Sequence, residues 1–181
     1  MLNSVIKNRN FLFLWIGHLI SHAGDAIYAI ALPWLILDMT GSKMQTALVV
    51  ITAYLPAIIF GFFAGVIVDK YNRKNIMIIS DVMRFLLVAF ISLALILDIA
   101  TPILLGIITF FLAAFATLFY PARDCFIPNL VMKKDLPNVN SLMIVSGQIA
   151  QVLGPLLVAI GLSFFGLIHL FTIDAISFFV S

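Results

Sequence analysis

The sequence predicts an all-α protein built from membrane-spanning helices, and three observations support this prediction. Hydrophobic residues make up 64% of the 181 positions, against about 45–50% in a soluble domain. Charged residues make up only 10%, against about 25%. Apolar runs recur along the whole chain at the length of roughly 20 residues that a helix needs to cross a bilayer. A soluble enzyme, a disordered chain and a disulfide-stabilised domain are therefore excluded.

Six spans are expected from the positions of charged and helix-breaking residues. The first run, from Asn10 to Leu37, carries one charge, Asp25. The third run has Asp81 and Arg84 near its start. The last uncharged run is too long for one span, so we expect a break between Gly161 and Gly166. The expected helices cover residues 11–37, 45–68, 76–97, 103–122, 139–164 and 168–181.

The Lys and Arg residues predict that the N-terminus is cytoplasmic. If it is, eight of the ten basic residues lie in cytoplasmic segments and only Lys43 lies in an outer loop, as the positive-inside rule requires. We expect Arg84 close to the cytoplasmic end of its helix. The sequence contains no long basic tract, so we expect no nucleic acid as a partner. The eight cytoplasmic residues are Lys7, Arg9, Lys70, Arg73, Lys74, Arg123, Lys133 and Lys134.

A very short charged loop joins the second and third spans. A positive-inside anchor with a tight turn would explain its basic residues. Its spacing, however, resembles the signature loop of the major facilitator superfamily: Gly, three residues, Asp, a basic residue, one residue, Gly, Arg and a basic residue. Asn72 stands where the family has Gly, and Asn tolerates a left-handed turn. The matching residues are Gly65, Asp69, Lys70, Arg73 and Lys74.

Further stretches resemble the drug:proton antiporter branch of this superfamily, which includes macrolide-efflux and siderophore-export proteins. The resemblance covers nearly the whole chain and implies a twelve-helix plan in which two six-helix halves enclose a central cavity. Residues 1–181 are then the N-terminal half, with a sixth helix truncated at Ser181, and a C-terminal half is needed as partner. The stretches include Asn10–Trp15, Gly24-Asp25, Ala31–Trp34, Asp81 with Arg84, Gly154-Pro155 and Asp174–Phe178.

The resemblance implies a secondary transporter of the cell membrane and no enzyme. Its expected work is proton-coupled efflux of small lipophilic or amphipathic compounds by alternating access, without a cofactor. Uptake, or transport of a specific natural product such as a siderophore, stays an alternative. So does a truncated or regulatory membrane module that transports nothing. The sequence contains no phosphate-binding loop of the Gly-x4-Gly-Lys-Ser/Thr type, which argues against ATP hydrolysis by that route.

Asp25 is the leading candidate for proton coupling, because a carboxylate inside the membrane is costly and usually functional. His18 and His22 precede it on the same helix face, and His22 is a second candidate because histidine titrates near neutral pH. A structural polar stripe, with Asp25 paired to a donor of another helix, is the alternative. Leu19 occupies the position where a zinc-protease motif has Glu, so no metal site is expected.

Further expectations concern the charged loop, a helix kink and polar residues of the last two spans. The resemblance implies that Arg73 pairs with Asp124, and that Asp69 braces a helix end in the other half. Gly154 and Pro155 predict a kink in the fifth span, as packing or as a functional signature. Gln148 and Gln151 lie one turn apart on the fifth span, and Asp174 lies in the sixth. The uncharged amides either hydrogen-bond helices together or line a substrate path, and the sequence does not decide between these.

Overall fold

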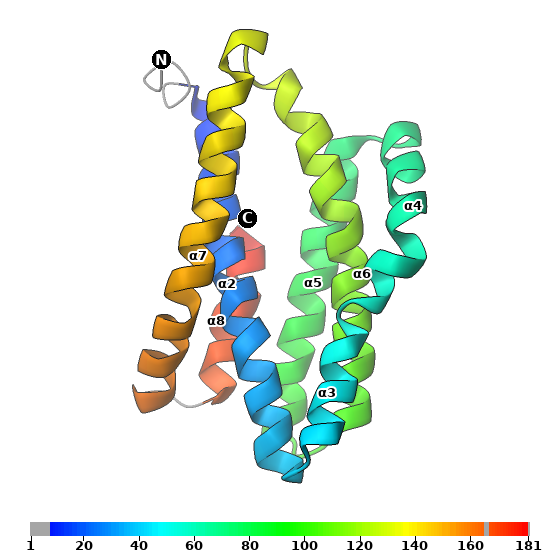
Figure 1. The fold of residues 1–181 in the computed structure, drawn as a ribbon, viewed down its shortest axis with the longest axis vertical. Helices are drawn as coiled ribbons and strands as arrows, with labels where there is room; N and C mark the ends of the chain where they lie inside the picture. Colours follow the sequence, from blue (N-terminus) through cyan, green and yellow to red (C-terminus); the bar gives the residue numbers. More distant parts are fainter. Residues whose placement is uncertain (1–7, 165–166, 181) are drawn as a thin grey trace.

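The computed structural model describes residues 8–164 and 167–180, and these residues form a helical bundle without any strand (Figure 1). The predicted all-α fold is confirmed. Lys7, Gly166 and Ser181, on which parts of the topology prediction rest, lie outside the described residues. The helices are α2 (Arg9–Thr40), α3 (Lys43–Thr52), α4 (Leu55–Lys70), α5 (Arg73–Ile96), α6 (Pro102–Phe126), α7 (Leu136–Phe164) and α8 (Leu167–Val180), with 3-10 turns at Ile127–Asn129 and Lys133–Asp135.

The second expected span is divided into two helices, which the prediction of one helix over 45–68 missed. α3 ends at Thr52 and α4 begins at Leu55. Pro56 lies in the first turn of α4, where its missing N–H is tolerated, whereas inside a continuous helix its ring would clash with the carbonyl of Thr52. The hydroxyl of Thr52 donates to the carbonyl of Val49 at 2.6 Å. The break therefore follows from Pro56.

Side-chain caps define the beginnings of most other helices. Asn8, Ser42, Asn72 and Thr101 each accept hydrogen bonds from backbone N–H groups in the first turn of α2, α3, α5 and α6. Such caps satisfy donors that a helix N-terminus leaves unpaired. At the other end of α2, Gly41 has a φ of 63°, a left-handed conformation that glycine adopts at little cost.

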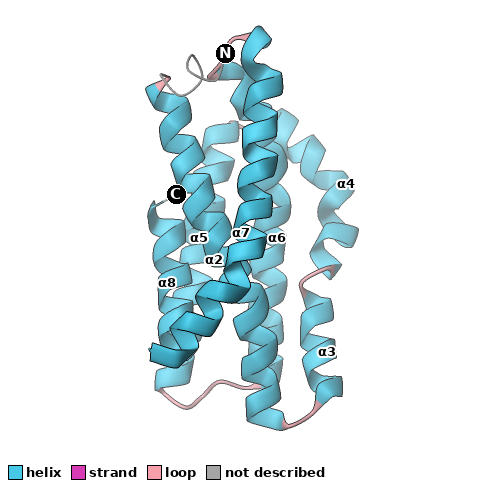
Figure 2. Ribbon diagram, turned by 60° about the vertical axis from the view of Figure 1, so that its left-hand side comes forward, coloured by secondary structure: helices cyan, strands magenta, loops and turns pink. Residues whose placement is uncertain are grey.

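The helices form two groups that meet along α2, α5 and α8 (Figures 1 and 2). In one group α7 and α8 pack against α2; in the other, α3, α4 and α5 pack against α6. Contacts of α5 with α8 and of α2 with α3 join the groups. The largest buried cluster lies among α2, α5, α6 and α8 and includes Ala31, Ile36, Val88, Ile91 and Phe171.

The surface of the bundle is apolar, as expected for a multi-pass membrane protein. Five described segments are long and apolar enough to cross a membrane, and α8 supplies a shorter apolar helix, His169–Phe179. Helix α4 exposes large side chains such as Ile58 and Phe62, which are 78% and 84% exposed. We call the end of the bundle that carries Asn8, Lys74, Arg123 and Lys133 the basic end; Lys43 lies at the far end (Figure 1).

Candidate functional site

An ion pair between two helices forms the centre of the site. The guanidinium of Arg84, on α5, donates to the carboxylate of Asp25, on α2. The side chain of Arg84 is 2% exposed, whereas that of Asp25 is 25% exposed. Arg84 is thus deeply buried, and its predicted place close to a helix end was wrong. It lies 11 residues into α5, or roughly 16 Å along the helix axis.

Two more helices contribute to the surroundings of this pair. From α6, the hydroxyl of Tyr120 donates to Oδ2 of Asp25 at 3.1 Å. From α8, the ring of Phe178 lies 4.0 Å from the Arg84 guanidinium carbon, an arrangement typical of a cation–π contact. On α5 itself, Oδ1 of Asp81 lies 3.8 Å from Nη1 of Arg84. One buried cation therefore serves two carboxylates and an aromatic face.

A second polar contact lies nearer the basic end. Nη1 of Arg123, on α6, lies 3.1 Å from Nδ1 and 3.2 Å from Nε2 of His18. A guanidinium can only donate, so the ring nitrogen that receives this bond carries no proton. His18 is thus held as a neutral acceptor by Arg123. This contact makes His18 a structural residue of the seam between α2 and α6.

His22 lies between the two polar contacts. Its ring packs edge-on against His18, with centroids 4.3 Å apart, and is 5.8 Å from the ring of Tyr120. Tyr120 in turn donates to Asp25. His18, His22 and Asp25 lie along one side of α2, as their spacing predicts. His18 contacts Arg123 of α6 and lines a cavity, whereas Asp25 is held by Arg84 of α5 and Tyr120 of α6.

Three polar contacts at different depths join α2 to α6. Beyond the contacts of His18 with Arg123 and of Asp25 with Tyr120, the hydroxyls of Tyr28 and Thr109 lie 2.8 Å apart. Both of these residues are buried. Hydrogen bonds between helices satisfy polar groups that the bilayer cannot solvate. We call this row the α2–α6 seam.

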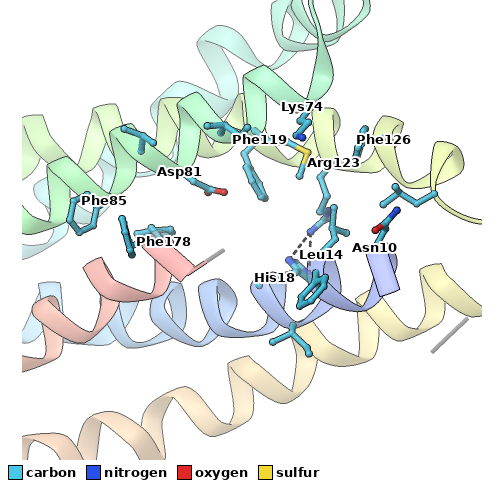
Figure 3. A pocket seen from close by; sticks show the side chains of 18 residues that line it. Asn10, Leu14, His18, Lys74, Asp81, Phe85, Phe119, Arg123, Phe126 and Phe178 are labelled. Carbon is cyan, nitrogen blue, oxygen red and sulfur yellow. Dashed lines mark hydrogen bonds between the residues drawn. The ribbon is translucent and has the colours of Figure 1, made fainter. Parts of the chain in front are cut away.

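A cavity of about 800 Å³ opens beside the seam toward the basic end (Figure 3). Asn10 and His18 from α2 and Arg123 from α6 supply its polar lining, together with Lys74 and Asp81 from α5. The remaining lining is largely apolar and includes Phe85, Phe119 and Phe126. Figure 3 shows Asp81 pointing into the space between α5 and α8, with Phe178 beside it. The cavity combines aromatic walls with both signs of charge.

The signature loop has a geometry that differs from two expectations. Asp124 accepts hydrogen bonds from its sequence neighbour Arg123, the shorter at 2.6 Å. Among the described residues Arg73 forms no ion pair with it, so the predicted pair was wrong for this structure. Asn72 has a φ of −66° and serves as the N-cap of α5, so no left-handed turn is needed. The switch role of Gly65, Asp69, Lys70, Arg73, Lys74 and Asp124 stays a prediction.

Arg73 instead faces the end of α6. Together with Asp69 and Asn72 it lines a hollow of about 310 Å³, whose other side is formed by Phe126 and Asn129. The carboxylate of Asp69 is exposed. Asp69 is thus accessible for contact with a further helix, and its predicted role as a brace is unchanged.

Gly154 brings α7 close to α2. A Cβ placed on Gly154 would lie 2.6 Å from the Cβ of Ala26, closer than two carbon atoms can approach. Helix α7 runs continuously past Pro155, so the packing contact is the visible role of Gly154, and the functional kink stays a prediction. Gln148 and Gln151 are exposed on the same helix.

Sequence reasoning missed three participants in the site. Tyr120 carried no signal, because a tyrosine in an apolar run is common. Arg123 was assigned to a loop, although it lies within α6. Arg84 was recognised as part of a motif, but only the three-dimensional structure reveals its pairing with Asp25. The alternative stated for Asp25, a pair with a donor of another helix, is what the structure shows, with Arg84 as the donor.

Comparisons with known proteins identify the family of this chain. A family model described as transmembrane secretion effector, one of the major facilitator group, matches residues 3–181. The chain belongs to the major facilitator superfamily. The resemblance found in the signature loop is thereby confirmed. No solved structure significantly matches this chain.

Named relatives of this major facilitator chain include efflux proteins. Macrolide efflux protein A of Streptococcus pyogenes is 26% identical over 167 residues, covering 92% of this chain and 41% of the relative. Multidrug efflux pump Tap of Mycolicibacterium fortuitum is 28% identical over 158 residues, covering 82% of this chain and 38% of the relative. An uncharacterised transporter of the same superfamily, YfiS of Bacillus subtilis, is 25% identical over 177 residues. The chain spans about two fifths of the length of these relatives.

Proposed function

We propose that this chain is the N-terminal half of a proton-coupled exporter of small lipophilic or amphipathic compounds that works by alternating access. The observation that carries the proposal is the Asp25–Arg84–Tyr120 cluster inside the bundle. Relatives named as macrolide and multidrug efflux proteins support the direction and the substrate class. A second half is needed, because the cavity of this superfamily lies between two six-helix halves.

Asp25 has the properties of a group that can bind and release a proton during transport. Its carboxylate is accessible, with a quarter of its side-chain surface exposed, while its partner Arg84 is buried behind it. Protonation of Asp25 would cancel its charge and release Arg84 from the ion pair. An unpaired guanidinium in the bundle is costly, so the helices that hold it, α2 and α5, would favour a different arrangement. Protonation is thereby coupled to conformation.

The lining of the cavity fits an amphipathic cargo. Phe85, Phe119 and Phe126 offer aromatic surface, and Asp81 lies at the wall of the same cavity. Such a combination suits a lipophilic compound with a polar end, since the aromatic walls accept its apolar part and a few polar groups orient the rest. The exposed loop beside Arg73 would change its contacts when the protein switches conformation. This loop lies at the basic end, which we place on the cytoplasmic side of the cell membrane.

The test is Asp25→Asn in the protein as its gene encodes it, assayed in inside-out membrane vesicles. A pH gradient should no longer drive uptake of a fluorescent lipophilic cation, because Asn cannot titrate. Exchange of labelled for unlabelled dye without a gradient should continue. Asp38→Asn is the matched control, since Asp38 is exposed on the same helix. If Asp25→Asn transports with the unmodified pH dependence, Asp25 is structural and the proposed coupling is wrong.

A further inference from the structure

Asp174 is a buried carboxylic acid that the proposed mechanism does not yet use. It lies on α8 and is 0% exposed. The α2 backbone comes so close at Gly24 that a Cβ there would collide with Oδ1 of Asp174 and with the hydroxyl of Ser177. Ser177 donates to the carbonyl of Asp174 at 2.7 Å and approaches Oδ1 at 3.5 Å. Among the described residues, Oδ2 of Asp174 has no hydrogen-bond partner.

Helices α2 and α5 pack against α8. Inside the bundle α2 carries Asp25 and Tyr28, and α5 carries Asp81 and Arg84. Helix α7 has no titratable side chain, and His169 on α8 itself is exposed. Phe178, one helical turn after Asp174, holds its ring against the Arg84 guanidinium. Arg84 therefore contacts both Asp25 and the face of α8 on which Phe178 and Asp174 lie one turn apart.

The local charges do not balance if both carboxyl groups are ionised. Arg84 is one cation, already paired with Asp25, and its Nε has no partner among the described residues. An ionised carboxylate at Asp174 would be buried without a cation or a full set of donors, which costs several kcal/mol in a low-dielectric interior. Asp81 adds no positive charge, and it lies on the cavity side of Arg84. A neutral Asp174 removes this cost.

We propose that Asp174 is a second proton-binding site, and that Asp25, Arg84 and Asp174 together hold one exchangeable proton. With Arg84 on Asp25, the proton is on Oδ2 of Asp174. When Asp25 takes up a proton, Arg84 turns to Asp174, which loses its proton. The three groups have a net charge of zero in both states, so the exchange avoids an unpaired buried charge. The inference rests on the proton coupling proposed above and extends it to α8.

Infrared spectroscopy of the purified protein, as its gene encodes it, tests the proposal without any transport assay. A carbonyl band of a protonated carboxylic acid is expected at neutral pH, and ¹³C-aspartate should shift it, because all acidic side chains in this sequence are Asp. Asp174→Asn should remove the band. Asp25→Asn should also remove it, because Arg84 is then free to stabilise an ionised Asp174. Asp98→Asn, an exposed loop change, should leave the band unchanged.

Each outcome of this experiment decides the proposal. A band that persists in Asp174→Asn assigns the proton to another group, and one that persists in Asp25→Asn shows that the two carboxyl groups are not linked; either result overturns the inference. If Asp174→Asn does not fold, Ser177→Ala takes its place. It removes the hydroxyl beside Oδ1 and should shift the frequency of the band. A band at the unchanged frequency would overturn the assignment to Asp174. Loss of gradient-driven transport in Asp25→Asn together with these contrary spectra would leave the proposed function standing and remove only the second site.

Discussion

Arg84 on α5 forms an ion pair with Asp25 on α2, although 59 residues separate them in the chain. Both residues lie within spans that must cross the bilayer, and each supplies the charge that makes the other tolerable there. The hydroxyl of Tyr120 supports the same carboxylate from a third helix. The ion pair and the hydroxyl of Tyr120 thus connect three spans at the depth where the proposed proton coupling occurs.

Replacing Arg84 alone should destabilise the protein more than replacing both members of the pair. Arg84→Met leaves Asp25 and Asp81 without their cation and should cost about 3–5 kcal/mol, the range for a broken buried pair. The lower part of the range is expected because Asp25 is partly exposed. Adding Asp25→Asn should recover much of the loss. Unfolding equilibria in mixed detergent measure both effects, and strictly additive costs would argue against a coupled pair.

Tyr120→Phe should alter both stability and pH dependence, whereas Tyr28→Phe should alter stability alone. A hydrogen bond to a charged group contributes about 1.5–3 kcal/mol, and a neutral one about 0.5–1.5 kcal/mol. Tyr120 donates to a carboxylate, while Tyr28 pairs with the neutral hydroxyl of Thr109. Tyr120→Phe removes the donor that contacts the proposed coupling carboxylate, so it should change the pH profile of transport. An unchanged profile would exclude Tyr120 from the coupling site.

Gly24→Ala should loosen the contact of α2 with α8. The added methyl group would collide with Asp174 and Ser177, and overpacking of this kind costs about 1–3 kcal/mol. Gly61→Ala is the matched control, because nothing lies within 4 Å of a Cβ at Gly61 and Ala favours a helix by about 0.5–1 kcal/mol over Gly. Thermal unfolding should separate the two variants; equal melting temperatures would contradict the close approach.

Impermeant thiol reagents should label the two ends of the bundle from opposite sides of the membrane. Tyr71 lies in the loop at the basic end and Ile99 in the loop at the far end; they are 59% and 51% exposed. In a Cys125→Ala background, Ile99→Cys should react in intact cells and Tyr71→Cys only after permeabilisation, as the positive-inside rule predicts. The reverse pattern would place the N-terminus outside the cytoplasm.

The sequence predicts the spans well because hydropathy and turn residues act locally. It did not reveal the division of the second span, although Pro56 was a visible warning. The predicted pair of Arg73 with Asp124 failed for a local reason as well: Arg123 is adjacent to Asp124 and reaches its carboxylate without any long-range ordering. The partner of Asp25 was beyond local rules, since only packing brings α5 beside α2. The proposed roles of Asp25 and the signature loop stay predictions.

The order of the helices along the chain has a consequence for how the protein is made. A ribosome delivers Asp25 to the membrane long before Arg84, so the arginine enters a bilayer that already holds its counter-ion. Asp174 arrives last of the three, when Arg84 is already paired with Asp25. Helix α8 therefore inserts with a carboxyl group for which Arg84 is not available. Insertion into the bilayer costs less free energy when that carboxyl group is protonated than when it is ionised.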